Sequence, residues 1–181
     1  VAFTADAATT LGGLALTIDN GATLTIGGNG ALRTATVAGD GTIAFAAFPA
    51  KPTLASTWTG TVELPAFLAG GEILTDYCIN GTSKLNLKGI TGGYLMWNDL
   101  DFQSELILAG DFILTDMSAR VFRFAKISGA GNISLSPGIY ELTSFTIGEL
   151  VEGYVGVVSN NMRTTAINIQ RLSLPSGASI A

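Results

Sequence analysis

The fold is decided between residues 14 and 45, where short runs of alternating apolar and polar residues are separated by turn residues. The sequence there reads Leu14-Ala15-Leu16-Thr17-Ile18, then Asp19-Asn20-Gly21, then Ala22-Thr23-Leu24-Thr25-Ile26. Short alternating runs between Asn, Asp and Gly turns, at a spacing of about ten residues, are typical of an all-β chain. In such strands we expect Leu, Ile and Phe to point inward and Thr and Asn to point outward.

Two architectures fit this rhythm. Antiparallel hairpins would use Asn-Gly and Asp-Gly as tight turns and build a sandwich, whereas a parallel β-helix would use the same residues as corners between faces. Internal similarity favours the second, because the segment Gly39 to Phe45 resembles the segment Gly129 to Leu135. Each is a Gly-x-Gly corner, a small polar residue and an alternating strand. We therefore predict a single-stranded right-handed parallel β-helix (solenoid), with an antiparallel β-sandwich as the alternative.

A second similarity joins the two ends of the chain. The segment Leu16 to Leu24 matches the segment Leu172 to Ile180 in character, position by position. A solenoid cut from a longer array of repeats would show this similarity, and so would a subunit that stacks its last coil on the first coil of the next subunit. We expect such an assembly interface to use the apolar residues near the two termini, which are Val1, Phe3, Leu172, Leu174 and Ile180.

Two prolines interrupt the strand pattern. Pro49 and Pro52 flank Lys51, and proline is excluded from central strands. The whole chain is expected to be one β-solenoid domain, 1–181, with N-terminal strand repeats (1–47), a connector (48–55) and a main body (56–181). Only two short segments, Leu64 to Gly70 and Asp116 to Lys126, allow a helix.

Composition limits the classes of partner. Hydrophobic residues make up 48% of the chain and charged residues only 13%, with 23 glycines, no histidine and a net charge of -5. A typical soluble domain has about 25% charged residues. Because the sequence is acidic and has no run of Lys or Arg, we expect no binding to nucleic acid or to anionic membranes. No apolar stretch of about 18 residues is present, so no membrane insertion is expected.

The single cysteine argues against thiol catalysis. Cys78 excludes an intramolecular disulfide, and its apolar surroundings predict a buried core thiol. A catalytic thiol needs a base beside it, and the chain has no histidine to serve as one. The chain therefore cannot use histidine chemistry, and we expect the protein not to be an enzyme. The start at Val1, with no signal peptide, is typical of a mature or excised segment.

Three motifs in the main body resemble those of a known family. They are Trp58-Thr59-Gly60-Thr61-Val62, the stretch from Leu87 to Leu95 (Leu-x-Gly-x-Thr-Gly-x-Tyr-Leu) and the stretch from Phe122 to Gly131 (Phe-x-Phe-x-x-Ile-Ser-Gly-x-Gly). Their order, roughly over residues 57–135, resembles bacterial autotransporter-like surface proteins, whose passengers carry Gly-rich β-strand repeats and fold as β-helices. The resemblance implies secretion to the bacterial surface and an adhesive or structural role, and it supplies no catalytic residues.

A few polar and aromatic residues are candidates for binding. Asp99 and Asp101 would lie on one face of a strand, where the two carboxylates could bind calcium, the only cofactor that we consider. Tyr94 and Trp97 could form a platform for surface glycans. A polysaccharide-active enzyme would instead need Asp99, Asp101, Asp111 or Arg120 to converge in one groove.

These observations together predict a non-catalytic extracellular structural or adhesive surface module. The first alternative is a subunit of a head-to-tail extracellular filament, strand-donating and pilin-like, whose partner is a second copy of the chain. The second alternative is a polysaccharide-active β-helix enzyme.

Overall fold

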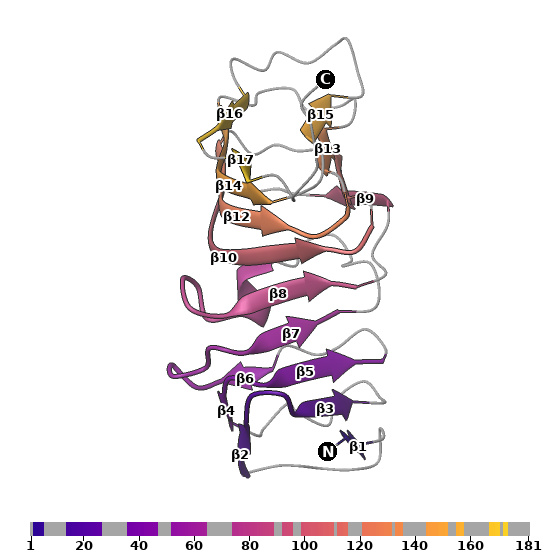
Figure 1. Cartoon of the computed structure of the whole chain (residues 1–181), viewed down its shortest axis with the longest axis vertical. Coiled ribbons are helices and arrows are strands. Elements are labelled where there is room, and N and C mark those ends of the chain that lie inside the picture. The colour runs from indigo at the N-terminus through magenta and orange to yellow at the C-terminus, as the bar shows by residue number, and fades with distance from the viewer. Residues whose placement is uncertain are drawn as a thin grey trace.

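The computed structural model shows an elongated stack of coils, with β1 (Ala2–Ala5) and β16 (Ile167–Ile169) at opposite ends (Figure 1). It describes residues 2–5, 14–26, 36–46, 52–64, 74–88, 92–95, 99–110, 112–115, 121–131, 133–135, 144–151, 155–157, 167–170 and 172–173. Every strand pairing among these residues is parallel. The chain is therefore a parallel β-solenoid, as predicted, and not the antiparallel sandwich.

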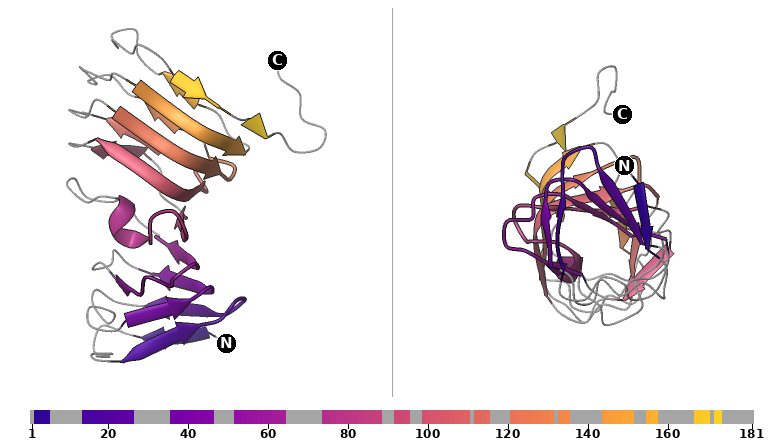
Figure 2. Two further views of the ribbon diagram at one scale, coloured as in Figure 1. Left: turned by 90° about the vertical axis from the view of Figure 1, so that its left-hand side faces the viewer. Right: turned by 90° about the horizontal axis from the view of Figure 1, so that it is seen from below.

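Three parallel sheets form walls of the solenoid, and the end-on view shows the coils arranged around a central axis (Figure 2). The long sheet contains β1 (Ala2–Ala5), β3 (Thr23–Ile26), β5 (Thr42–Phe45), β7 (Thr61–Glu63), β8 (Lys84–Leu87), β10 (Leu100–Leu108), β12 (Val121–Ser128), β14 (Ser144–Val151), β16 (Ile167–Ile169) and β17 (Leu172–Ser173). The second sheet contains β2 (Ala15–Ile18), β4 (Thr36–Gly39) and β6 (Thr53–Leu54). The third contains β9 (Gly92–Leu95), β11 (Phe112–Thr115), β13 (Ile133–Leu135) and β15 (Val155–Val157).

Each turn of the solenoid as far as β14 adds one strand to the long sheet, and the last described coil adds two short strands, β16 and β17, which both pair with β14. Residue 23 is aligned with residue 42 and residue 42 with residue 61, so these coils are 19 residues long. Farther along, residue 84 is aligned with residue 105 and residue 105 with residue 126, which gives coils of 21 residues. This lengthening coincides with the change from the second sheet to the third as the partner of the long sheet.

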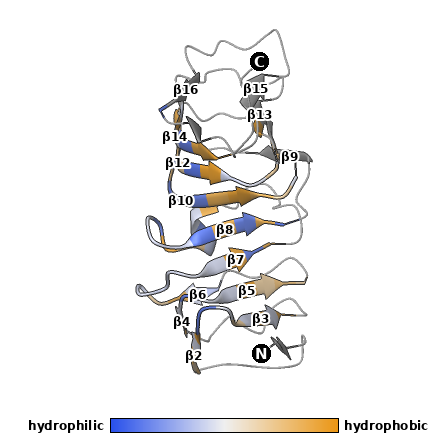
Figure 3. Cartoon of the chain, in the orientation of Figure 1, coloured by the Kyte–Doolittle hydropathy of each residue, from blue (hydrophilic) through white to orange (hydrophobic). Residues whose placement is uncertain are grey.

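The core is built from ladders of apolar side chains that stack from coil to coil. One residue in each of seven successive strands of the long sheet is buried, and each is in register with the next: Leu24, Ile43, Val62, Leu85, Leu106, Ile127 and Leu150. Their neighbours along each strand face outward and are mostly Thr, Lys or Glu, and Figure 3 shows hydrophilic residues on β8 and in parts of β10 and β12. The predicted inward and outward faces are confirmed in these strands.

Glycine makes the corners possible. Gly39 and Gly129 have φ angles of +110° and +95°, a region that favours residues without a Cβ. A Cβ at Gly39 would lie 2.2 Å from the Ile18 carbonyl oxygen, and one at Gly129 would lie 2.2 Å from the Leu108 carbonyl oxygen. The two Gly-x-Gly motifs are thus corners, as predicted, and each permits the backbone of one coil to lie directly on the coil before it.

The two corners are not equivalent positions in the coil, however. The Gly39 corner leads from β4 of the second sheet to β5 of the long sheet, and the Gly129 corner leads from β12 of the long sheet toward β13 of the third. The similar segments at the two ends of the chain are also not in equivalent positions. Leu16 lies in the second sheet and Leu172 in the long sheet, so the matched segments do not form equivalent faces.

Local expectations based on proline and on helix signals need correction. Part of the expected connector, Thr53–Leu54, is strand β6 and pairs with β4, so coil stacking continues through it. The segment Asp116 to Lys126 is not a helix where it is described, because β12 begins at Val121 and alternates exposed and buried residues. Residues 65–70 lie outside the described residues. The one helix that the structure describes is a 3₁₀ turn, η1 (Leu74–Tyr77), which the sequence did not indicate. No helix in the described ranges is long and apolar enough to span a membrane.

Candidate functional site: the polar cluster at the start of β10

The polar cluster lies where the long sheet becomes wider. β8 is in register only with the second half of β10, from Glu105 to Leu108. The first half of β10 extends beyond β8 and pairs with β12 on its other side. The loop that follows η1 occupies the place next to this unpaired edge (Figure 1). An unpaired edge of backbone N–H and C=O groups needs other partners, and this loop supplies them.

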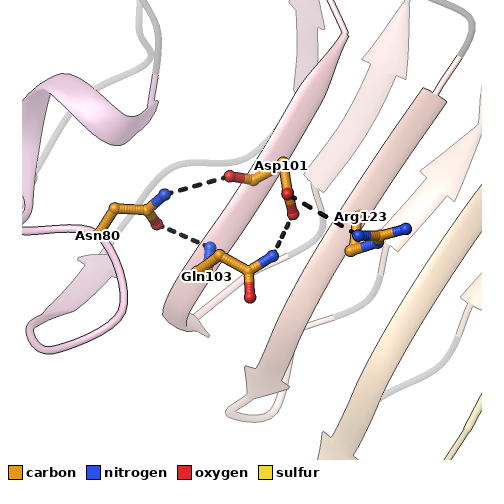
Figure 4. Close-up of polar contacts among 4 residues, drawn as sticks. All are labelled: Asn80, Asp101, Gln103 and Arg123. Atoms are coloured by element: carbon orange, nitrogen blue, oxygen red, sulfur yellow. Dashed lines mark hydrogen bonds and ion pairs between the residues drawn. The ribbon is translucent and has the colours of Figure 1, made fainter.

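The Asn80 side chain replaces a strand along this edge (Figure 4). Its Oδ1 accepts a hydrogen bond from the Gln103 backbone N–H at 2.7 Å, and its Nδ2 donates to the Asp101 carbonyl oxygen at 3.3 Å. The next residue continues the contact, since the Gly81 N–H donates to Ser104 Oγ at 3.0 Å. We name these contacts of Asn80 and Gly81 with β10 the Asn80 latch. One amide side chain has a donor and an acceptor in fixed positions, so it matches a stretch of strand backbone.

The two aspartates predicted as a calcium site both lie at the start of β10 and contact protein groups. The Asp101 carboxylate accepts a hydrogen bond from Gln103 Nε2 and lies 3.9 Å from Arg123 Nη1 (Figure 4). The Asp99 carboxylate accepts a hydrogen bond from the Val121 N–H at 2.9 Å. Each carboxylate therefore links β10 to the coil of β12. No group of three or more His, Cys, Asp or Glu within the described ranges is arranged to hold a metal ion.

Beneath the latch is a small buried group of hydroxyls. Ser104 Oγ donates to the Ile79 carbonyl oxygen at 3.2 Å, and Ser83 Oγ accepts from the Ile79 N–H at 2.7 Å. Cys78 is buried beside them, which confirms the predicted core thiol. Burial raises the pKa of the Cys78 thiol, and the Ser104 and Ser83 hydroxyls only partly offset this effect. A thiol with a raised pKa is mostly protonated and a poor nucleophile at neutral pH.

A charge ladder runs along the outer face next to the cluster. Glu105 lies between Lys84 on β8 and Lys126 on β12, with Oε2 3.7 Å and 3.5 Å from their Nζ atoms. The Ser128 hydroxyl donates to Glu105 Oε1 at 2.6 Å. Burial alone would raise the pKa of Glu105, but the Ser128 hydrogen bond and the two lysines lower it below its usual range. Opposite charges in successive coils thus hold neighbouring strands in register.

Glu105 should make the stability of the protein sensitive to acid. Because the folded protein lowers the pKa of this carboxyl, its contribution is complete above the unfolded pKa of about 4.3 and is lost as pH falls through the lower folded pKa. We expect Glu105→Gln to be less stable than the wild type at neutral pH and to lose less stability on acidification. Urea unfolding at a series of pH values measures both effects.

Ser128→Ala is the companion variant for this experiment. It keeps both lysines but removes the hydrogen bond to the carboxylate, so the pKa of Glu105 should move back toward its usual range. Its acid sensitivity should lie between those of the wild type and Glu105→Gln. Equal acid sensitivity in all three proteins would show that Glu105 does not make this contribution.

The remaining predicted site residues are only partly described. Tyr94 lies in β9, next to β11, and its side chain is outside the described residues, as are Trp97, Asp111 and Arg120. Of the expected assembly residues, Val1, Leu174 and Ile180 also lie outside. Phe3 is in β1 and Leu172 is in β17, at opposite ends of the long sheet. The described structure pairs Asp101 with Arg123 and Asp99 with the Val121 backbone N–H, and it does not place the aromatic residues relative to them.

Sequence reasoning missed the residues that organise this region, Asn80 and Glu105. Asn80-Gly81 was readable as a turn, but the partners of its side chain lie 21 and 23 residues away in the next coil. The charge ladder had a signal, since Lys84, Glu105 and Lys126 recur at the spacing of one coil. That signal becomes useful only when the coil length is known.

A comparison of the chain with protein-family models, with curated proteins and with solved structures finds no match. Functional arguments therefore depend on the geometry described above.

Proposed function

We propose that this chain is a non-catalytic structural or adhesive module of the bacterial cell surface, in which the solenoid serves as a short rigid spacer. The observation that carries the proposal is the long sheet, which continues from β1 to β16 through successive coils. Eight strand-to-strand steps of about 4.8 Å give a stack on the order of 40 Å. Each coil is hydrogen-bonded to the next, so the stability of the stack is built from contacts between neighbouring coils.

The outer face of the long sheet supports a structural role. Its charged side chains pair between successive coils: Lys84 and Lys126 with Glu105, Lys88 with Glu63 at 3.7 Å, and Arg123 with Asp101. These contacts use opposite charges to align strands, and exposed pairs of this kind contribute little energy each. A catalytic site would instead bring a nucleophile, a base and an anion-stabilising group together around one bound substrate.

Extracellular localisation and adhesion follow from sequence features. Charged residues are only 13% of the chain, and Gly, Thr and Ser are frequent, as in the Gly-rich surface proteins that it resembles. Surface glycans are the partner class that such a polar face would meet outside the cell. No nucleic acid partner is proposed, because the net charge is -5.

Incubation of the purified chain with a panel of bacterial and host polysaccharides tests this proposal. A structural or adhesive module should release no new reducing ends or unsaturated sugars from any of them. Retention of the protein on one polysaccharide without cleavage would support adhesion, and no retention would support a spacer role alone. Cleavage of any polysaccharide, abolished by Asp101→Asn but not by Glu63→Gln, would contradict the proposal and favour the enzyme.

One observation favours the filament as a second candidate. The strands at the two ends of the long sheet continue the register of the buried ladder, with Phe3 of β1 aligned with Leu24 and Leu172 of β17 aligned with Leu150. A second copy that placed its β1 next to β17 would continue this ladder in the same direction. β1 pairs with β3 of its own chain, so assembly would proceed by stacking of end coils rather than by donation of β1.

Electron microscopy at increasing protein concentration separates these two functions. The spacer predicts discrete short particles at every concentration. Filaments that disappear in a Phe3→Asp variant, while Leu14→Asp leaves them intact, would favour the assembly; Leu14 is an exposed apolar residue of the described part and serves as the matched control.

A further inference from the structure

The sequence contains three Asn-Gly pairs, Asn20-Gly21, Asn29-Gly30 and Asn80-Gly81. The second lies outside the described residues. The other two are exposed turns of similar backbone shape, since φ is +79° at Gly21 and +90° at Gly81. They differ in the contacts of the asparagine side chain and of the glycine N–H. These contacts decide whether the asparagine can lose its side-chain amide.

An asparagine followed by glycine can lose its side-chain amide without an enzyme. The backbone nitrogen of the glycine gives up its proton and attacks Cγ of the asparagine, which forms a C–N bond and expels the side-chain nitrogen as ammonia. Water then opens the resulting succinimide at either carbonyl. The net reaction consumes one water, releases one ammonia and leaves aspartate or isoaspartate. It requires a free asparagine side chain and a glycine nitrogen that can approach it.

The Asn80 latch blocks both requirements. The Asn80 side chain is held toward β10 by its two hydrogen bonds to the Asp101 carbonyl and the Gln103 N–H (Figure 4). The attacking nitrogen is also occupied, because the Gly81 N–H donates to Ser104 Oγ, a hydroxyl on a buried side chain. Reaction at Asn80 therefore requires that three hydrogen bonds open together.

Asn20 has no such protection. Its turn is closed by a backbone hydrogen bond from the Ala22 N–H to the Asp19 carbonyl oxygen at 2.9 Å. The Asn20 side chain takes no part in this bond. Among the described residues, the Asn20 side chain has no hydrogen-bond partner, and apart from the chain neighbours of Gly21 no atom lies within 4 Å of the position that a Cβ on Gly21 would take. The side chain can rotate toward the Gly21 nitrogen while the coil stays folded.

We propose that Asn20 is a site of spontaneous deamidation in the folded protein and that the Asn80 latch protects Asn80 from the same reaction. The product would place a new carboxylate beside Asp19 and near Asp40, which follows the register partner of Ile18 in the next coil. Reaction at Asn80 would destabilise the protein more, because the new carboxylate cannot donate a hydrogen bond to the Asp101 carbonyl oxygen.

The test follows both sites in one sample. The intact protein is incubated in mildly alkaline buffer, with and without urea, and aspartate and isoaspartate at each asparagine are quantified by peptide mass spectrometry. In the folded protein, Asn80 should react roughly tenfold or more slowly than Asn20, because it must wait for a local opening. In urea the two rates should converge. Equal rates at the two sites in the folded protein, or a rate at Asn20 as low as that at Asn80, would overturn the proposal.

Two variants identify the latch as the cause. Ser104→Ala frees the Gly81 nitrogen and should speed the reaction at Asn80 while the rate at Asn20 stays the same. Unchanged protection of Asn80 in a folded Ser104→Ala protein would contradict the role of this hydrogen bond. If that variant does not fold, Asn80→Asp should still lower the Tm by several degrees and Asn20→Asp by much less. Equal Tm values for these two variants would also contradict the proposal.

Discussion

Gly129→Ala is expected to destabilise the protein by about 3 kcal/mol or more, because two separate effects act at this corner. The φ angle of +95° is unfavourable for any residue that has a Cβ. The new Cβ would also lie 2.2 Å from the Leu108 carbonyl oxygen, and this atom is backbone that cannot rotate away. The same oxygen accepts a hydrogen bond from the Gly131 N–H at 3.1 Å, so relief of the overlap would weaken the stacking of the two coils.

Gly21→Ala separates the two effects. Gly21 also has a positive φ, +79°, but no atom lies within 4 Å of the position of its Cβ. Only backbone strain should appear, at about 1 kcal/mol. Chemical denaturation of both variants measures the difference. Equal losses of stability would show that the coils do not approach each other at Gly129 as closely as the structure places them.

Phe124→Ala should cost about 3 to 5 kcal/mol, the usual range for removal of a fully buried aromatic side chain. Phe124 is completely buried in the widened part of the long sheet. Its ring lies 6.3 Å from that of Phe102 in the preceding coil, and the two backbones are in register. In a stack of coils the resulting cavity borders the coils on either side, so little of it can be filled by local collapse.

Val121→Ala is the matched control, since Val121 lies on the same strand but faces outward and is 36% exposed. Its effect should stay within about 0.5 kcal/mol. Thermal or urea unfolding of both variants gives the comparison. A Phe124→Ala protein as stable as Val121→Ala would contradict the assignment of faces in β12.

The sequence allowed the fold to be predicted because each strand is short and alternates with period two. In β3 and β5 the alternation of Thr or Ala with Leu, Ile or Phe specifies which residues are buried, and the turns between strands consist of Asp, Asn and Gly. The Gly-x-Gly corners were informative because a backbone that touches the next coil requires glycine. These patterns involve residues that are close together in the chain. They can therefore be recognised without knowing which coils lie next to each other.

The remaining features depend on contacts between coils. Coil length changes from 19 to 21 residues or more, so a residue cannot be assigned to a sheet by counting from the start of the chain. This is why Leu16 and Leu172 were matched although they lie in different sheets. The Asn80 latch is a substitute for a missing length of strand. This substitute is needed because β10 extends beyond β8. The sequence alone does not show which part of β10 lacks a partner strand.

Cross-linking of paired cysteines tests the parallel stacking of coils most directly. Thr42 and Thr61 are in register on neighbouring strands of the long sheet, a separation of about 4.8 Å that a disulfide can bridge. Oxidation of Thr42→Cys with Thr61→Cys is predicted to form an intramolecular cross-link in the folded protein. A hairpin around Asp40-Gly41 would instead bring Val37 opposite Ala44. A cross-link in Val37→Cys with Ala44→Cys, and none between positions 42 and 61, would contradict the solenoid.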